Sequence, residues 1–235
     1  MTTTPKVRRS SHRRPHTPVA GLAVFDLDRT LIPGASAVAL LRELAARKLV
    51  TRPDVIRAGL EQVLYRRRGS TDAQIERARR RGLSIVAGME SEPLLAVADV
   101  VAARLASTVC PAARYLLDRH LTSGDSCVLL SSSPQELVER LGRLLGMHHS
   151  IGTRATVADG RYTGALDRPP CYGPGKLDAL RLALGDVDLR ETFAYADSAS
   201  DLALLRACGH PVAVNPDRRL HRVARQEGWP TLVLG

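Results

Sequence analysis

Short apolar runs recur along this chain, separated by segments in which apolar positions follow a helical spacing. The runs occupy Leu22–Phe25, Cys127–Leu130, Phe193–Ala196, Val212–Val214 and Thr231–Leu234. Runs without polar alternation are typical of parallel strands that helices cover on both faces. Helical patterns lie between them, at Pro134–Leu145, Lys176–Leu184 and Leu202–Ala207. This alternation predicts an α/β fold built on a doubly wound parallel sheet with right-handed crossovers.

A long segment separates the first apolar run from the second. It contains about a hundred residues, far more than an ordinary crossover requires. Helical patterns fill most of it, at Val38–Arg47, Arg57–Tyr65, Thr71–Ala87 and Glu92–Ser107. We therefore predict a helical cap inserted after the first strand. The predicted division is a basic disordered tail at 1–18, a core at 19–33 and 110–235, and a cap domain at 34–109.

One further pair of strands is expected outside the main sheet. Ala155–Val157 and Arg161–Leu166 are joined by Asp159-Gly160. Because Asp-Gly suits the tight primed turns that connect antiparallel strands, this region predicts a β-hairpin.

The chain of 235 residues is strongly basic, with a formal net charge of +10 at pH 7. Basic residues gather in the N-terminal tail, with Lys6, Arg8, Arg9, Arg13 and Arg14, and in a second cluster of Arg66–Arg68, Arg77 and Arg79–Arg81. Such surfaces attract phosphorylated substrates, acidic lipid or nucleic acid, but solvated arginines give the same composition, and both interpretations stay open. Weak contact of the tail with an acidic membrane is one expectation. Aromatic residues make up only 3%, so stacking platforms are scarce and we expect no specific nucleic-acid partner.

The cysteines and the apolar segments bear on the cellular compartment. The four cysteines show no C-x-x-C spacing, so we expect free thiols at Cys110, Cys127, Cys171 and Cys208 rather than a zinc site or a disulfide framework. No apolar run approaches the ~18 residues that span a bilayer, and the run before Asp26 is too short for a signal peptide. These features favour a cytoplasmic protein, and they leave its oligomeric state open.

Two carboxylates follow the first predicted strand, in the sequence Asp26-Leu27-Asp28-Arg29-Thr30. The carboxyl ends of the strands in an open α/β sheet border the crevice where ligands bind. Two carboxylates there can divide the roles of nucleophile and acid/base. They can also cap a turn. A D-x-D-x-T pattern is expected about 0.06 times in a chain of this composition, so its place after an apolar strand adds to its weight.

Ser131 and Lys176 occupy comparable positions further along the chain. Ser131 ends the second strand, where a hydroxyl and free backbone N–H groups suit a phosphate. The neighbouring Ser133 is expected to be the N-cap of the next helix, with Pro134 at its first position. Lys176 begins a helix after Gly173-Pro174-Gly175, and it can place a positive charge on a phosphate and on neighbouring carboxylates.

Asp197 and Asp201 follow the third apolar strand. Beside Asp26 and Asp28 they would complete an oxygen-rich site at one edge of the sheet. Magnesium prefers one or two carboxylates, several waters and a substrate phosphate oxygen, and positioning plus charge neutralisation is most of what phosphoryl transfer requires. A structural alternative for Asp201 is the N-cap of the helix at 202–207.

The order of these residues resembles that of the haloacid-dehalogenase-type hydrolases, in the branch similar to phosphoserine phosphatase with a helical cap after the first strand. The resemblance extends from about Gly21 to the C-terminus. It implies that Asp26 is the nucleophile, which forms an aspartyl-phosphate, and that Asp28 is the general acid/base. It further implies that Ser131 and Lys176 bind the phosphoryl oxygens, and that Thr30 supports the loop around them.

The same resemblance implies a magnesium cofactor and a small-molecule phosphomonoester as substrate. Magnesium would be held by Asp26, the backbone carbonyl of Asp28 and Asp197. Asp201 would act indirectly, through water or by orienting Lys176.

Two positions depart from the family pattern. Phosphoserine-specific relatives have a Glu that meets the substrate amine where this chain has Ala35, so a different small phosphorylated metabolite or a lipid headgroup is expected. Ala196 occupies a place where the family usually has Gly. Two other functions stay open, namely phosphotransfer to an alcohol through the same intermediate and a regulatory or binding role on this fold.

Overall fold

The computed structural model describes residues 21–51, 53 and 72–234. The expected tail at 1–18, the expected helix at 57–65 and Arg66–Arg68 lie outside the described residues. The expected helix at 71–87 is described from Asp72 onward.

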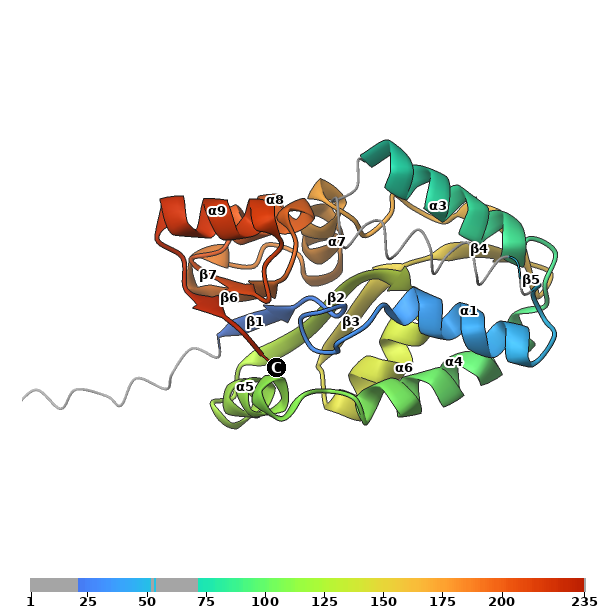
Figure 1. The fold of residues 1–235 in the computed structure, drawn as a ribbon, viewed down its shortest axis with the longest axis horizontal. Coiled ribbons are helices and arrows are strands. Elements are labelled where there is room, and N and C mark those ends of the chain that lie inside the picture. Colours follow the sequence, from blue (N-terminus) through green and yellow to red (C-terminus); the bar gives the residue numbers. More distant parts are fainter. Residues whose placement is uncertain (1–20, 52, 54–71, 235) are drawn as a thin grey trace, which may run out of the picture.

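A six-stranded sheet in the order β3-β2-β1-β6-β7-β8 forms the centre of the fold (Figure 1). All neighbouring strands in it are parallel. The strands are β1 (Leu22–Phe25), β2 (Ser126–Pro134), β3 (His149–Thr153), β6 (Thr192–Ala196), β7 (His210–Val214) and β8 (Thr231–Leu232). The chain builds one half of the sheet outward from β1 through β2 and β3, and the other half through β6, β7 and β8. The strand order therefore reverses between β1 and β6, where open α/β sheets bind ligands beyond the carboxyl ends of the strands.

Helices cover both faces of the sheet, as the apolar runs predict. Ala23 and Phe25 of β1 belong to an apolar cluster with the helices on one face, whereas Val24 belongs to a second cluster on the other face. This alternation follows from the two-residue period of a strand. The first face carries α5 (Pro111–Thr122) and α6 (Gln135–Leu145), and the second carries α7 (Pro174–Leu184), α8 (Leu202–Ala207) and α9 (Arg218–Glu227) (Figure 1). Two short 3-10 helices, η1 (Leu189–Glu191) and η2 (Ala199–Asp201), lie before and after β6.

The segment between β1 and α5 is mostly helical where it is described, as predicted. It contains α1 (Ser36–Ala46), α3 (Asp72–Val86) and α4 (Ser91–Ala106). The buried side chains of α1 and α4 share one apolar cluster with the sheet and with α6. The helix α3 instead lies beside the β-hairpin. The boundaries proposed for the cap, at 34 and 109, stay a prediction.

The hairpin itself is confirmed. Strands β4 (Ala155–Ala158) and β5 (Arg161–Leu166) are antiparallel, and Asp159 and Gly160 both have positive φ, as a primed turn requires. The turn is bonded to the helical segment, because the backbone N–H of Ser91 donates to the carbonyl of Gly160.

Two features of the half of the sheet that contains β2 and β3 differ from what the sequence predicts. The sequence did not predict β3, because only Ile151 in it is a large apolar residue and Gly152 lies against the backbone of Ser133 and Gln135. The prediction that Ser133 caps α6 is wrong, because β2 continues through Pro134, which takes the N-cap position. The hydroxyl of Ser133 instead hydrogen-bonds to that of Ser36 at the start of α1.

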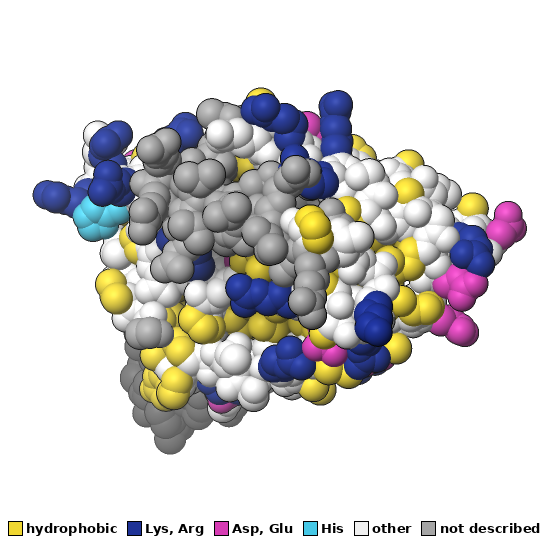
Figure 2. All heavy atoms as spheres, turned by 45° about the vertical axis from the view of Figure 1, so that its right-hand side comes forward, with side chains coloured by type: hydrophobic (Ala, Val, Ile, Leu, Met, Phe, Trp, Pro, Cys, Tyr) yellow, Lys and Arg dark blue, Asp and Glu magenta, His cyan; other side chains and the backbone are white. Residues whose placement is uncertain are grey.

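The described surface shows basic side chains scattered over the face that carries the inserted helices (Figure 2). Within the second arginine cluster, Arg79 and Arg80 both pair with Glu76. All four cysteines are free, as expected. Among the described residues no single helix is long and apolar enough to cross a membrane; α4 and α5 meet that test only as a pair, with a bend of 99° between them.

The shared apolar cluster makes a matched pair of substitutions in α4 informative. Val97 is fully buried and Val100 is 38% exposed. We expect Val97→Ala to lower the free energy of unfolding by about 2 kcal/mol, because it removes two buried methyl groups and leaves a cavity. Val100→Ala should change it by less than about 0.5 kcal/mol. Urea unfolding measures both, and equal effects would contradict the packing of α4 on the sheet.

Candidate active site

Asp26 lies immediately after β1, at the point where the strand order reverses. Its backbone N–H donates to the carbonyl of Tyr195 in β6 at 2.9 Å, so the residue is held between the two central strands. Its side chain is buried. The Nζ of Lys176 is 2.6 Å from Oδ1, and the hydroxyl of Thr30 donates to Oδ2 at 3.2 Å. Both carboxylate oxygens therefore have a partner within the protein.

Asp28 faces the inserted helices. Its Oδ1 accepts a hydrogen bond of 2.9 Å from the backbone N–H of Ser36, the first residue of α1. Burial and, to a lesser extent, the nearby Asp26 carboxylate raise the pKa of this carboxyl to about 6, against the lowering effect of the bonds from Ser36. A carboxyl with such a pKa can donate and accept a proton near neutral pH.

Lys176 connects two of the predicted carboxylates. Its Nζ lies 2.6 Å from Oδ1 of Asp26 and 2.8 Å from Oδ2 of Asp201. Burial disfavours the charged ammonium, but the carboxylates of Asp201 and Asp26 outweigh this effect and raise the pKa of Lys176 above its ordinary value. The ammonium is therefore a fixed positive charge at the carboxyl ends of the strands.

The loop before Lys176 explains how the lysine reaches this position. Gly173 has a φ of +56°, which favours glycine. A Cβ on Gly175 would lie 2.4 Å from the carbonyl oxygen of Pro170. The chain can turn this tightly into α7 only because both residues lack a side chain.

Asp197 and Asp201 follow β6, as predicted, and both are buried. Asp201 occupies the N-cap position of α8, as the structural alternative expects, but its side chain makes no capping hydrogen bond and its carboxylate binds Lys176 instead. Burial, together with the Asp26 carboxylate, raises the pKa of Asp197 to about 8. Burial also raises the pKa of Asp201 to about 6, against the lowering effect of Lys176.

Ser131 lies at the same edge of the sheet. The parallel register pairs Phe25 of β1 with Leu129 of β2. Ser131 lies two residues beyond Leu129 and is therefore level with Leu27, which lies two residues beyond Phe25. Its side chain is buried, and its Oγ accepts a hydrogen bond of 3.2 Å from the backbone N–H of Ser133. The hydroxyl hydrogen is therefore available to a ligand oxygen.

Four residues that the sequence did not single out organise this edge. Arg29 pairs with Asp197, with 3.2 Å between Nε and Oδ2, and the side chain of Asn215 donates to the carbonyl of Arg29. Ser36 binds Asp28. Asp217 follows β7 and accepts hydrogen bonds from the loop after Asp197. Asn215 and Asp217 could have been found from their position beyond a strand end, whereas the roles of Arg29 and Ser36 depend on contacts across the fold.

The donor set fits a magnesium ion. Buried carboxylates outnumber the positive side chains that contact them, which are Lys176 and Arg29. Among the described residues no group of three or more His, Cys, Asp or Glu side chains has an arrangement that would hold a metal ion by itself. Magnesium needs no such cage, because it uses one or two carboxylates and keeps waters or substrate oxygens. Asp26, Asp197 and the carbonyl of Asp28 are therefore the group to test.

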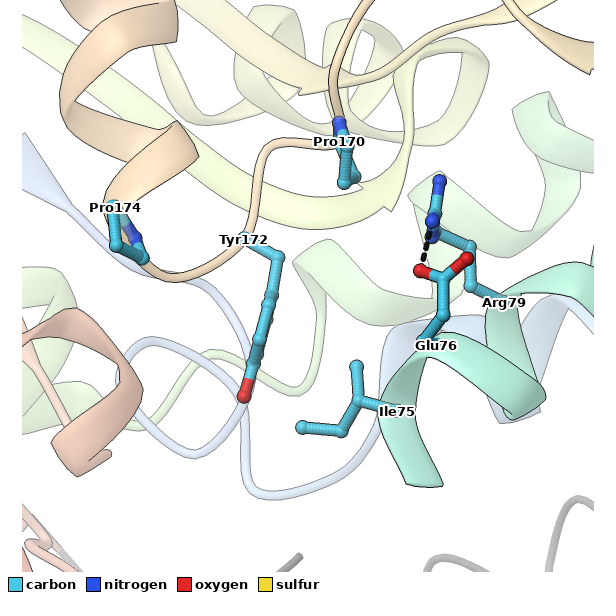
Figure 3. Close-up of a pocket in the computed structure, with 6 residues that line it drawn as sticks. All are labelled: Ile75, Glu76, Arg79, Pro170, Tyr172 and Pro174. Carbon is cyan, nitrogen blue, oxygen red and sulfur yellow. Dashed lines mark hydrogen bonds and ion pairs between the residues drawn. The ribbon is translucent and has the colours of Figure 1, made fainter. Parts of the chain in front are cut away.

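A cavity of about 250 Å³ lies between α3 and the loop that leads to Lys176 (Figure 3). Its lining residues are Ile75, Glu76, Arg79, Pro170, Tyr172 and Pro174. Figure 3 shows Ile75 and Tyr172 approaching each other from the two segments, with the Glu76–Arg79 ion pair beyond them. Pro174, which lines this cavity, is two residues before Lys176 in the chain.

Comparison with known proteins connects this arrangement to a family. A family model described as haloacid dehalogenase-like hydrolase matches residues 23–206. The phosphoserine phosphatase SerB1 of Mycobacterium tuberculosis is 34% identical over 229 residues, which cover 96% of this chain and 74% of that protein. A histidinol-phosphatase of Neisseria meningitidis is 32% identical over 90% of this chain and 97% of its own length. A solved structure of a protein of unknown function from Bordetella pertussis superposes with a TM-score of 0.80 at 28% identity, covering 92% of this chain and 99% of that one.

The raised pKa of Asp28 predicts how the stability of the metal-free protein depends on pH. The folded protein holds this proton with a pKa of about 6, against an ordinary value of 3.8, so ionisation favours the unfolded chain as the pH rises from about 4 to about 7. In EDTA, the free energy of unfolding of the wild type should fall over this range by up to about 2 kcal/mol relative to Asp28→Asn. Urea unfolding at several pH values tests this, and parallel curves for the two proteins would contradict it.

Proposed function

This chain belongs to the haloacid dehalogenase-like hydrolase family and is a phosphatase, and on that premise we propose that it hydrolyses small phosphate monoesters through an aspartyl-phosphate on Asp26. The observation that supports this most strongly is the buried contact of Lys176 with Asp26 and Asp201 at the switch point of the sheet. This contact supports the roles proposed for Asp26 as nucleophile and for Lys176 as phosphate-binding cation, because it lies where such sheets bind ligands.

In the first step, an oxygen of the Asp26 carboxylate forms a bond to phosphorus while the bond from phosphorus to the ester oxygen breaks. Asp28 gives its proton to that leaving oxygen. In the second step, water attacks phosphorus and gives a proton to Asp28, and the bond between phosphorus and Asp26 breaks. Inorganic phosphate leaves, and both carboxyl groups return to their starting states.

The neighbouring groups hold the phosphoryl oxygens during both steps. Lys176 neutralises their negative charge, and the hydroxyl of Ser131 donates to them. Thr30 fixes the orientation of the Asp26 carboxylate through its hydrogen bond to Oδ2. Asp201 acts through Lys176, whose ammonium it anchors at 2.8 Å.

Magnesium is the cofactor of this proposal. Asp26, the backbone carbonyl of Asp28 and Asp197 would hold it, and it would supply further neutralisation of the phosphoryl charge. Burial and, after it, the neighbouring Asp26 carboxylate raise the pKa values of Asp197 and Asp201, and a bound divalent ion would offset this concentration of negative charge.

The leaving group of the substrate is proposed to occupy the cavity between α3 and the loop before Lys176. Apolar side chains line much of it, and Glu76 there is already paired with Arg79 and Arg80. Ala35, which precedes α1 without a polar side chain, offers no carboxylate to an amine. Two relatives are named for phosphoserine and histidinol phosphate, which both carry an amine. The preference of this chain is therefore tested by comparing its activity on substrates with and without an amine.

The mechanism predicts the behaviour of the Asp26→Asn variant. Wild-type protein should release phosphate from an aryl phosphate in the presence of magnesium and lose this activity in EDTA. The variant should lose at least about a thousandfold in kcat, because an amide is a poor nucleophile toward phosphorus. A phosphate-release assay measures both, with Asp188→Asn on the exposed surface as a control that keeps full activity. Substantial activity in Asp26→Asn would exclude Asp26 as the nucleophile.

The proposed cavity predicts the order of substrates in a panel of phosphorylated metabolites. Phosphoserine should not be preferred over phosphate monoesters without an amine, as measured by kcat/KM. Ala35→Glu should raise kcat/KM for phosphoserine relative to the other substrates by about tenfold, because a carboxylate would then be available to the amine. High selectivity of the wild type for phosphoserine would show that another residue supplies that contact.

A further inference from the structure

Arg29 occupies a backbone conformation that favours glycine. Its φ is +64°, in the left-handed region. Hydrogen bonds fix the residue there, because its N–H donates to the carbonyl of Ile32 at 2.7 Å and its own carbonyl accepts from the side chain of Asn215 at 2.8 Å. Glycine would adopt this loop with less strain, so the presence of arginine is explained by its side chain rather than by the turn.

The side chain of Arg29 lies against the carboxylate that the proposed function assigns to the metal. Its Nε is 3.2 Å from Oδ2 of Asp197, with the Arg29 and Asp197 side chains 24% and 8% exposed. Its Nη2 also donates to the carbonyl of Asn215 at 3.5 Å. Lys176 is bonded to Asp26 and Asp201 instead. Within the described chain, Arg29 is therefore the residue that forms an ion pair with Asp197.

We propose that Arg29 is a built-in counter-cation that neutralises Asp197 in the metal-free enzyme and competes with magnesium for that carboxylate. The inference rests on the proposed function, which assigns Asp197 to the metal. A divalent ion bound to Asp197 must either displace the guanidinium or remain within a few ångströms of it, and like charges at that separation repel. Arg29 thereby weakens metal binding, and it stabilises the arrangement of carboxylates before the ion arrives.

The consequence is that Arg29 sets the magnesium concentration at which the enzyme becomes active. Arg29 is a positioning residue in this account, because it acts on substrate only through Asp197 and the metal. The shape of the loop does not depend on its side chain, since the hydrogen bonds that fix the turn use its backbone N–H and carbonyl. The side chain can therefore be removed without removing the turn.

A magnesium titration of protein first stripped with EDTA tests this inference. The readout is the thermal unfolding midpoint at increasing magnesium chloride, with sodium chloride adjusted to keep ionic strength constant, since a ligand that binds the folded state raises the midpoint. Fitting the midpoints to the linkage relation gives the half-saturating magnesium concentration, which should be on the order of threefold to tenfold lower for Arg29→Gly than for the wild type. Arg29→Lys keeps a positive charge near Asp197 and should stay closer to the wild type than Arg29→Gly does.

Arg190→Gln provides the matched control, because it removes an exposed arginine that pairs with Asp188 and lies before β6, at the opposite end of that strand from Asp197. It should leave the half-saturating concentration unchanged. If folded Arg29→Gly binds magnesium no more tightly than the wild type, the inference is overturned while the proposed function stands. If the wild type itself shows no magnesium-dependent shift, the metal of the proposed function fails, and the inference fails with it.

Discussion

The buried ammonium of Lys176 is the constraint on which the rest of this structure depends. A lysine excluded from water is stable only when its charge is paired and hydrogen-bonded. Here the partners are Asp26 and Asp201, at 2.6 and 2.8 Å. Asp26 follows the end of β1, Asp201 ends the short helix η2 after β6, and Lys176 lies in the first turn of α7. The two ion pairs therefore fix where these elements lie relative to one another. The ammonium of Lys176 that joins them is also available to a phosphoryl group.

The topology of the sheet makes this meeting of distant residues straightforward. Because β1 lies between β2 and β6, the residues that follow these three strands meet at one edge. Asp26 and Asp197 follow β1 and β6, Ser131 lies in the last part of β2, and Gly173 and Gly175 bring Lys176 to the same place. The inserted helices reach the same edge of the sheet, because the backbone N–H of Ser36 donates a hydrogen bond to Asp28. Phosphoryl transfer, which depends largely on positioned charges around the reacting group, suits such a site.

The sequence predicts those features that depend on local patterns. Apolar runs identify five strands of the sheet, and Asp159-Gly160 identifies the hairpin, because strand burial and primed turns leave local signatures. Strand β3 has no such signature, since it is a mostly polar edge strand. Ser133 was misassigned as a helix cap because its real partner, Ser36, lies 97 positions away. The role of Arg29 is equally invisible in the sequence, because it depends on a positive φ and on a contact with Asp197.

The central claim is that the phosphoryl group of the substrate is transferred to Asp26 before water removes it. The most direct measurement is mass spectrometry of peptides from enzyme that is quenched in acid within its first turnovers of an aryl phosphate, with magnesium present. The account predicts one phosphoryl group on the peptide that contains Asp26, and none on the peptides that contain Asp197 or Asp201. A phosphoryl group on either of those aspartates, or turnover with no phosphorylated peptide at any quench time, would contradict it.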